Sequence, residues 1–421
     1  MTAAAPALFR LRGIEGLALG VLWLVMTTGG IVFREPAPID ALMMMVLSAA
    51  LVLGIRIERG LWPPAILLAV YVAFEALGSA QAPKIGDTLV YSLVTLYLSA
   101  SGLLIACLVA WNPARVLPVI LSAIAVAALI ATVAGIAGYF SLFGGADELF
   151  TKFGRAKGTF KDPNVFAPFL ILPMMYAFMR LLTLGPFGGI VWTPVILALF
   201  AGLFLSFSRG AWLHAAVSSM VLLGFAWAFV PSRGIRARAV LVAAAGAAVL
   251  AFGITWALSI QEIGSLFAER ASLEQSHDLG AQGRFAGQVK AVAVIVQEPF
   301  GIGTTAFERY HHEQPHNVYL NVFLNAGWVG GLAYLALVAL TLARALPLAT
   351  RPGRYQLLAI PIVACFLGLA VEGLIIDTDR WRHFYWIVGM IWGLSVADMR
   401  DRGPANAPAG TRAQATAAAA A

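Results

Sequence analysis

Three of the six histidines in this chain lie close together in a polar segment, 301–317, that leads directly into an apolar run. They are His311, His312 and His316. Pro315 disfavours the helical conformation in the residue before it, so we expect His316 at the start of the next helix. An imidazole at such a boundary suits general-base catalysis, because its unperturbed pKa lies near neutral pH. A polar residue that only marks the start of a helix is the alternative.

Two arginines lie where an anion could reach them. Arg209 is in the short turn Ser208-Arg209-Gly210 between two apolar runs, and Arg284 lies within Gln282-Gly-Arg-Phe in the polar segment 259–317. A guanidinium presents a planar fork of donors that fits phosphate or carboxylate. For Arg209 the alternative is an anchor at a helix end whose side chain reaches toward water.

A third polar feature is the basic stretch Lys152, Arg155, Lys157 and Lys161, which is interrupted by glycines. Glycine lets backbone amides approach an anion closely. The stretch is therefore a candidate phosphate contact, with a solvated loop as the alternative.

A metal site is the competing interpretation of the histidines. His312-Glu-Gln-Pro-His316 matches the letters of the zinc-protease pattern His-Glu-x-x-His. That pattern requires both imidazoles on one continuous helix, and Pro315 disfavours a helix there. Cys107 and Cys365 lie inside apolar runs, so neither a cysteine-based metal site nor a disulfide framework is indicated. We expect no metal and no nucleotide cofactor.

These side chains must be positioned by membrane helices. Of 421 residues, 60% are hydrophobic and 12% charged, which excludes a soluble enzyme and a disordered chain. Several apolar runs reach the length that crosses a bilayer as a helix. We predict an all-α polytopic integral membrane protein with about 12 transmembrane helices and one large periplasmic loop. The predicted spans are 14–33, 41–55, 63–80, 88–110, 116–141, 164–184, 187–207, 211–230, 239–258, 318–343, 356–376 and 383–398.

The charge distribution orients these spans. With the N-terminus in the cytoplasm, the inner side receives 15 Lys and Arg against 4 acids, from a formal net charge of +7. The net charge thus reflects topology, and no nucleic-acid partner is implied. Residues 1–258 then hold spans one to nine, with the basic loop 142–163 outside. The large outer loop is 259–317, spans ten to twelve lie in 318–402, and 403–421 is a disordered cytoplasmic tail.

Two further features depend on these spans. Phe285, Val289, Val292 and Val296 have a spacing that puts them on one helical face, so part of the large loop is expected to be an ordered helix against the membrane surface. Glu75 and Glu372 fall inside spans, where carboxylates are costly and are functional candidates. Acids that are protonated or paired near a span end are the alternative.

The polar motifs together resemble those of the bacterial O-antigen ligase family, which includes related O-antigen polymerases. His316-Asn317, nine residues and Gly327-Trp-Val-Gly330 are similar to its His-Asn-x9-Gly-x-x-Gly signature. Ser206-Phe-Ser-Arg-Gly-Ala-Trp212 resembles its arginine motif. Gly158-Thr-Phe-Lys-Asp-Pro-Asn164 resembles its Gly-Thr-Phe…Pro-Asn segment.

This resemblance implies glycan transfer at the periplasmic face of a bacterial inner membrane. The donor would be a glycan on undecaprenyl pyrophosphate, and the acceptor a hydroxyl of lipid A–core or another lipid-linked glycan. His316 would activate the acceptor, and Arg209 and Arg284 would bind the pyrophosphate, with Arg270 and Arg309 as competitors for the latter role. Further substrate contacts are predicted for Asn317, Arg155, Lys157, Lys161, Arg309 and Tyr319. Asn317 could instead cap the next helix, and Gly327 and Gly330 could permit close packing.

Other functions stay open at this level. A polymerase of the same family would differ from a ligase only in its acceptor. A multi-span transporter or lipid flippase would suit the intramembrane acids, but the hydropathy shows no inverted repeat. A membrane scaffold without chemistry is the third possibility.

Overall fold

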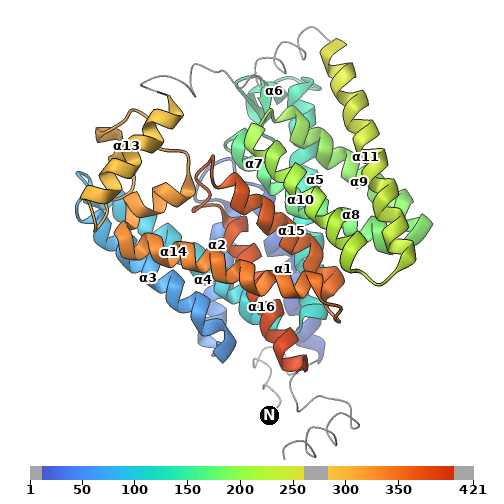
Figure 1. Cartoon of the computed structure of the whole chain (residues 1–421), viewed down its shortest axis with the longest axis horizontal. Helices are drawn as coiled ribbons and strands as arrows, with labels where there is room; N and C mark the ends of the chain where they lie inside the picture. The colour runs from blue at the N-terminus through green and yellow to red at the C-terminus, as the bar shows by residue number, and fades with distance from the viewer. Residues whose placement is uncertain (1–11, 260–282, 403–421) are drawn as a thin grey trace, which may run out of the picture.

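The computed structural model describes residues 12–259 and 283–402, and most of this part of the chain is helical (Figure 1). The α-helices are α1 (Arg12–Thr27), α2 (Pro38–Val52), α3 (Trp62–Ser79), α4 (Ile85–Trp111), α5 (Pro113–Tyr139), α6 (Ala146–Phe150), α7 (Pro163–Phe169), α8 (Ile171–Thr183), α9 (Gly185–Leu205), α10 (Arg209–Phe229), α11 (Arg233–Ser259), α13 (Arg284–Gln297), α14 (Val318–Thr350), α15 (Gln356–Glu372) and α16 (Arg382–Arg402). The 3-10 turns are η2 (Thr28–Gly30), η3 (Arg59–Leu61) and η4 (Ala306–Arg309), and strands β1 (Thr151–Lys152) and β2 (Arg155–Ala156) form an antiparallel hairpin.

Long apolar sequences fold as these helices because a helix satisfies its own backbone hydrogen bonds in hydrocarbon. Within the described ranges, eight helical segments are long and apolar enough to cross a membrane. They comprise α3, α4, α5, α7 with α8, α9, α10, α11 and α14. The chain is thus an all-α, multi-pass membrane protein. A helix lies at each predicted span. Several of these helices are too short or too charged to be counted among the eight. The figure of twelve crossings stays a prediction.

The centre of the bundle is the tightly packed pair α4 and α16. A Cβ atom on Gly389 would lie 2.2 Å from the carbonyl oxygen of Gly102, a distance that no side chain tolerates. The two backbones therefore touch, as small residues allow between membrane helices. This contact fixes the axis of α16, and with it the loop that precedes α16. We call residues 373–381, between α15 and α16, the α15–α16 loop.

The longest helix, α14, is broken near its start. Gly327 has φ 63° and ψ −167°, and a Cβ there would lie 2.4 Å from the carbonyl oxygen of Pro299. Only glycine fits that conformation and that space. The break separates the first turns of α14, which follow His316, from its long apolar part.

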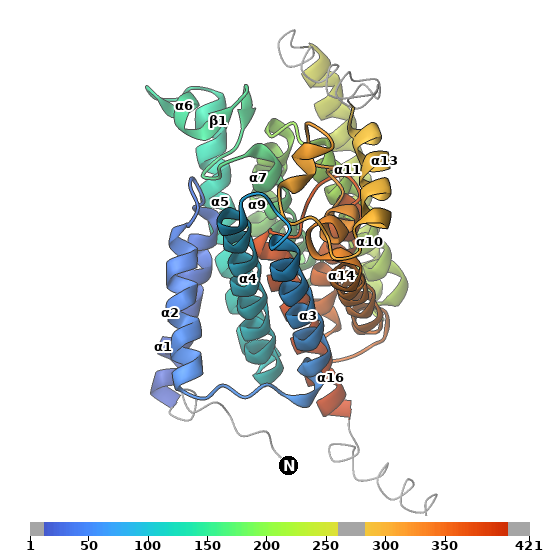
Figure 2. The same cartoon turned by 90° about the vertical axis from the view of Figure 1, so that its left-hand side faces the viewer.

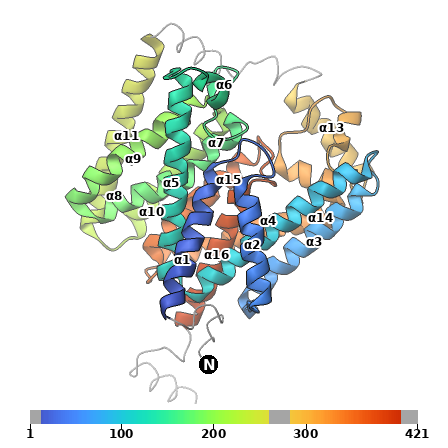
Figure 3. The same cartoon turned by 180° about the vertical axis from the view of Figure 1, so that it is seen from behind.

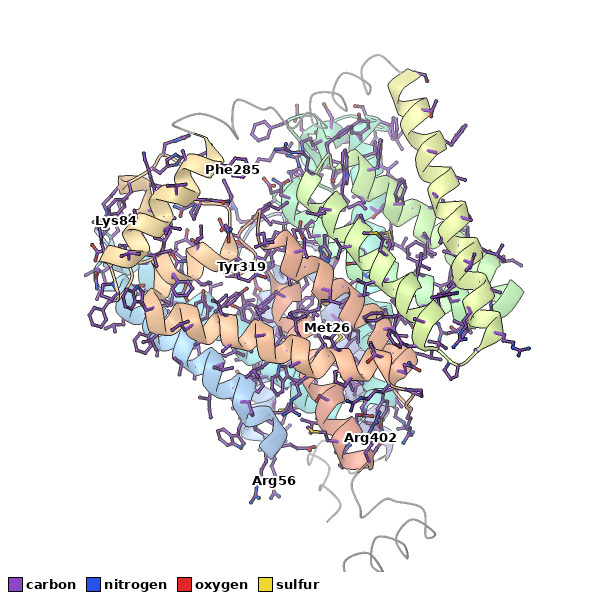
Figure 4. The ribbon with its side chains drawn as sticks, in the orientation of Figure 1. Met26, Arg56, Lys84, Phe285, Tyr319 and Arg402 are labelled. Atoms are coloured by element: carbon purple, nitrogen blue, oxygen red, sulfur yellow. The ribbon has the colours of Figure 1, made fainter. Side chains whose placement is uncertain are left out.

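The two long polar segments, 142–163 and 283–317, lie at one end of the bundle, which we call the upper end (top of Figure 2). It carries α6, the hairpin and α13, whereas α16 ends at the opposite end. From behind, α5 lies beside α1 and reaches up to α6 (Figure 3). The labelled side chains agree with this arrangement, since Phe285 and Tyr319 lie in the upper half of Figure 4, and Arg56 and Arg402 lie near the bottom.

The polar segments contain regular structure. The helix expected from Phe285, Val289, Val292 and Val296 is α13, and these four side chains are between 50% and 73% exposed on its outer face. Its opposite face packs against the segment that follows it. Residues 142–163 hold α6 and the hairpin. The predicted tail 403–421, Arg270 and most of the first part of the large loop lie outside the described residues.

Candidate active site

His316 occupies a constrained position at the upper end. It lies between Pro315 and Asn317, with φ +48°, and its side chain is 35% exposed. Asn317 caps α14, because its Oδ1 accepts hydrogen bonds from the backbone N–H groups of Tyr319 (3.1 Å) and Leu320 (3.3 Å). The imidazole is thus held at the first turn of α14 and still reaches solvent.

Two carboxylates flank this imidazole. Asp377 Oδ2 lies 3.8 Å from His316 Nδ1, and Glu313 Oε2 lies 4.0 Å from Nε2. Asp377 Oδ1 also accepts a hydrogen bond from the backbone N–H of Asn317 (3.1 Å), which orients the carboxylate. A carboxylate beside Nδ1 stabilises the charge that forms when Nε2 accepts a proton. The arrangement is chemically suited to general-base catalysis.

Asp377 was absent from the residues selected from sequence. It belongs to Asp377-Thr-Asp-Arg380, a charged run in a short connection on the same predicted outer face as His316. This shared face is the sequence feature that could have pointed to Asp377. His316 and Asp377 are 61 positions apart, and no spaced motif links them, so the sequence gives no reason to prefer Asp377 to other acids.

Arg209 is the first residue of α10 and is half-buried. The turn before it is rigid: Phe207 has φ +48° and is buried against Trp212, whose indole N–H donates to the carbonyl of Leu203 (3.2 Å). The N-cap Ser208 makes no side-chain capping bond. A cation on the positive end of a helix dipole concentrates positive potential there, which favours an anionic ligand.

Arg284 is also the first residue of a helix, α13, whose N-cap Gly283 has no side chain to cap it. One turn further, Gln288 Nε2 donates to the carbonyl of Pro315 (3.3 Å). Lys290 Nζ lies 3.5 Å from the carbonyl of Tyr310. These contacts bring the start of α13 next to the segment that carries His316.

The basic stretch divides into bound and available cations. Arg155 joins the hairpin to the turn before α10, because its Nε donates to the carbonyl of Ser206 (2.7 Å) and its Nη2 to Asn164 Oδ1 (2.7 Å). Lys152 pairs with Asp162 (2.9 Å). Lys157 is half-buried, and within the described ranges no hydrogen bond or ion pair is recorded for its ammonium group.

Lys161 takes part in a charge network instead. Its Nζ lies 2.5 Å from Glu35 Oε2, and Arg382 Nη1 lies 3.2 Å from Glu35 Oε1. Burial alone would raise the pKa of Glu35, but the hydrogen bond from Lys161 and the charges of Lys161 and Arg382 lower it below its ordinary value. Lys161 therefore has a structural partner.

Two other predicted contacts also have partners within the protein. Arg309 is exposed, and its Nη2 lies 3.5 Å from the carbonyl of Gln81. The hydroxyl of Tyr319 donates to the carbonyl of Ala370 (2.7 Å), which joins α14 to α15.

The segment that contains His312 and His316 is not helical, so the two imidazoles do not share the helical face that a zinc-protease site requires.

Glu75 and Glu372, the two acids predicted to lie inside spans, are both paired. Glu75 Oε1 lies 3.2 Å from Arg380 Nη2, and Glu372 Oε2 lies 2.8 Å from His214 Nδ1. Both carboxylates have 0% exposure. Each acid thus lies at one end of the α15–α16 loop, which carries Asp377 between them.

Residues 194–335, which span α10, α13, His316 and the first part of α14, match the family model described as O-antigen ligase. None of the curated proteins matches the chain. Over residues 194–335 the chain is therefore similar to the O-antigen ligase family.

Proposed function

We propose that this protein is an O-antigen ligase-like glycosyltransferase that works at the periplasmic face of a bacterial inner membrane. It transfers a glycan from undecaprenyl pyrophosphate to a hydroxyl of lipid A–core or another lipid-linked sugar. One observation carries the proposal: a histidine flanked by Asp377 lies near the starts of two helices that each begin with an arginine.

The reaction is a single displacement. The acceptor hydroxyl attacks the anomeric carbon of the donor while its proton passes to Nε2 of His316, whose Nδ1 faces Asp377. The new carbon–oxygen bond forms as the bond from the anomeric carbon to the diphosphate oxygen breaks. Attack from the face opposite the leaving group inverts the anomeric configuration.

The leaving group departs as undecaprenyl pyrophosphate, and its negative charge grows as the bond breaks. Arg209 and Arg284 at the helix starts stabilise this charge, and Lys157, which follows β2, contributes to the same stabilisation. These cations supply the countercharge, so the proposal includes no divalent ion. Transfer that persists in excess EDTA is the expected result.

The test uses purified protein with an undecaprenyl-pyrophosphate glycan and a lipid-linked acceptor. Replacing His316 with Ala should lower kcat by roughly 10²–10⁴-fold, the usual contribution of a general base. Replacing Arg209 with Ala should cost roughly 10²–10³-fold through lost charge stabilisation. His312→Ala is the matched control, because its imidazole is 53% exposed and does not contact Asp377. Full activity of both His316→Ala and Arg209→Ala would refute the proposal.

The choice between ligase and polymerase depends on the acceptor. Loss of a polymerase leaves lipid A–core capped with single repeat units, whereas loss of a ligase leaves uncapped core and accumulated lipid-linked polymer. The lipopolysaccharide profile of a deletion strain, complemented with wild type or with His316→Ala, distinguishes them.

A further inference from the structure

The α15–α16 loop is joined to the first turns of α14 at several points. Three hydrogen bonds make this connection: the N–H of Val318 to the carbonyl of Gly373 (2.8 Å), the N–H of Asn317 to Asp377 Oδ1 (3.1 Å), and Asn321 Nδ2 to Asp379 Oδ1 (3.4 Å). The loop therefore sets where Asp377 lies relative to His316. Any residue that fixes the ends of this loop also fixes that relation.

Glu372 fixes the first end. Its Oε2 lies 2.8 Å from Nδ1 of His214, whose Nε2 lies 3.0 Å from the carbonyl of Cys365. Both imidazole nitrogens of His214 are therefore engaged, and the pairing makes the complete burial of the Glu372 carboxyl group tolerable.

The same contact reaches α10. A Cβ on Gly210 would lie 3.2 Å from Glu372 Oε1, so the carboxyl group lies directly against the residue after Arg209. Glu372 thus joins the helix that begins with Arg209 to the loop that carries Asp377.

Glu75 fixes the second end. Arg380 Nη2 lies 3.2 Å from Glu75 Oε1 and donates to Thr304 Oγ1 (2.9 Å), and its guanidinium lies 4.6 Å from the centre of the Tyr91 ring. These contacts tie the loop to α3, to α4 and to the segment between α13 and α14. Glu75 is fully buried, whereas the Arg380 side chain is 25% exposed.

We propose that Glu75 and Glu372 are positioning residues, which act through the α15–α16 loop to hold Asp377 beside His316. The catalytic part of this inference rests on the proposed function. Removing one partner of a buried pair leaves an unbalanced group that the surrounding structure must move to accommodate. Because the loop is anchored at two ends by two different helices, loss of either anchor shifts Asp377.

The first experiment measures the geometry without measuring transfer. The full-length protein is treated with diethyl pyrocarbonate, and the modification rate of His316 is followed by peptide mass spectrometry. Glu75→Gln and Glu372→Gln keep side-chain shape and remove only the carboxylate. We expect both variants to raise the His316 rate at least severalfold, because an imidazole released from Asp377 is more accessible, with His312 as the internal reference.

The matched control is Glu58→Gln. Glu58 also pairs with an arginine, with its Oε1 3.1 Å from Arg400 Nη1, but in the α2–α3 connection, away from the α15–α16 loop. Its His316 rate should equal that of wild type. Equal rates in Glu75→Gln, Glu372→Gln and wild type overturn the proposal, whether or not the protein transfers glycans. If a Gln variant does not fold, Thr304→Val removes one hydrogen bond of Arg380 without changing charge, and the same increase is expected.

The second experiment is a double-mutant cycle in the transfer assay. Glu75→Gln should lower kcat by about tenfold to a hundredfold, the usual effect of a small displacement of a reacting group. In the Asp377→Asn background the same substitution should have little further effect, because its route of action is already lost. If the effects of Glu75→Gln and Asp377→Asn on kcat multiply in the double variant, Glu75 does not act through Asp377. If wild type and all variants fail to transfer glycan while the modification rates of His316 change as expected, that result refutes the proposed function and leaves the positioning role intact.

Discussion

The Asp377→Asn substitution tests the chemistry of the candidate site most directly. Asparagine keeps an oxygen that can accept the hydrogen bond from the backbone N–H of Asn317, so the start of α14 should be preserved. What disappears is the negative charge 3.8 Å from His316 Nδ1. The variant therefore isolates the electrostatic contribution of the carboxylate.

Its size follows from the geometry. The side chains of His316 and Asp377 are 35% and 22% exposed, so the medium between them is closer to water than to a protein interior. Unit charges at 3.8 Å interact by about 1 kcal/mol in water and about 2 kcal/mol at half that dielectric constant. If His316 becomes positively charged in the transition state, losing Asp377 should lower kcat by about 5- to 30-fold.

The assay is steady-state transfer from an undecaprenyl-pyrophosphate glycan, at low and high salt. The loss should shrink at high salt, because partly exposed charges are screened. Glu308→Gln is the matched control, since Glu308 is an exposed acid in η4 and should leave kcat unchanged. An unaltered kcat in Asp377→Asn refutes the pairing. A loss as large as that of His316→Ala refutes the supporting role, because Asp377 would then act as the base itself.

Three further predictions concern the structure around the site. Asn317→Ala should lower the free energy of unfolding by about 1 kcal/mol, because the cap of α14 is lost, whereas Asn317→Asp should keep wild-type stability in thermal denaturation. Equal stability of wild type and both variants contradicts the capping role. Gly389→Val should prevent stable folding, because even a Cβ would lie 2.2 Å from the Gly102 carbonyl oxygen, and a monodisperse variant with wild-type Tm would argue against the α4–α16 contact. The folded-state pKa of Glu35 lies below its ordinary value of 4.5, so its contribution to stability is present above that pH and is lost as the pH falls through the folded value. The Tm difference between wild type and Glu35→Gln should therefore be present at neutral pH and vanish in acid. A Tm difference that grows in acid would contradict this prediction.

Hydrophobic pattern predicted most of the helices, because long apolar runs have few other options in a bilayer. The spacing of Phe285, Val289, Val292 and Val296 likewise predicted α13, and the side chains lie on one exposed face. These are local properties of sequence, and periodicity records them directly.

The contacts around the site were not accessible in the same way. Asp377 reaches His316, and Glu372 reaches His214, only after helices distant in sequence have packed. The left-handed conformation of His316 depends on its neighbours and has no counterpart in residue type. Likewise, Lys161 is a predicted substrate contact from sequence, but in the structure Glu35, from the α1–α2 connection, lies beside it. Charge patterns identify candidates, and only tertiary packing assigns their partners.

The exposed apolar face of α13 has a consequence for reconstitution if the helix lies against a lipid surface, as its sequence predicts. The side chains of Phe285, Val289, Val292 and Val296 are exposed. Trp328 Nε1 donates to the carbonyl of Ile295 (2.7 Å), which joins α14 to α13 in addition to packing. We expect headgroups and acyl chains to cover these four side chains. The start of α13, with Arg284, should therefore be better ordered in nanodiscs than in small micelles, and reconstitution conditions become a variable of the catalytic geometry.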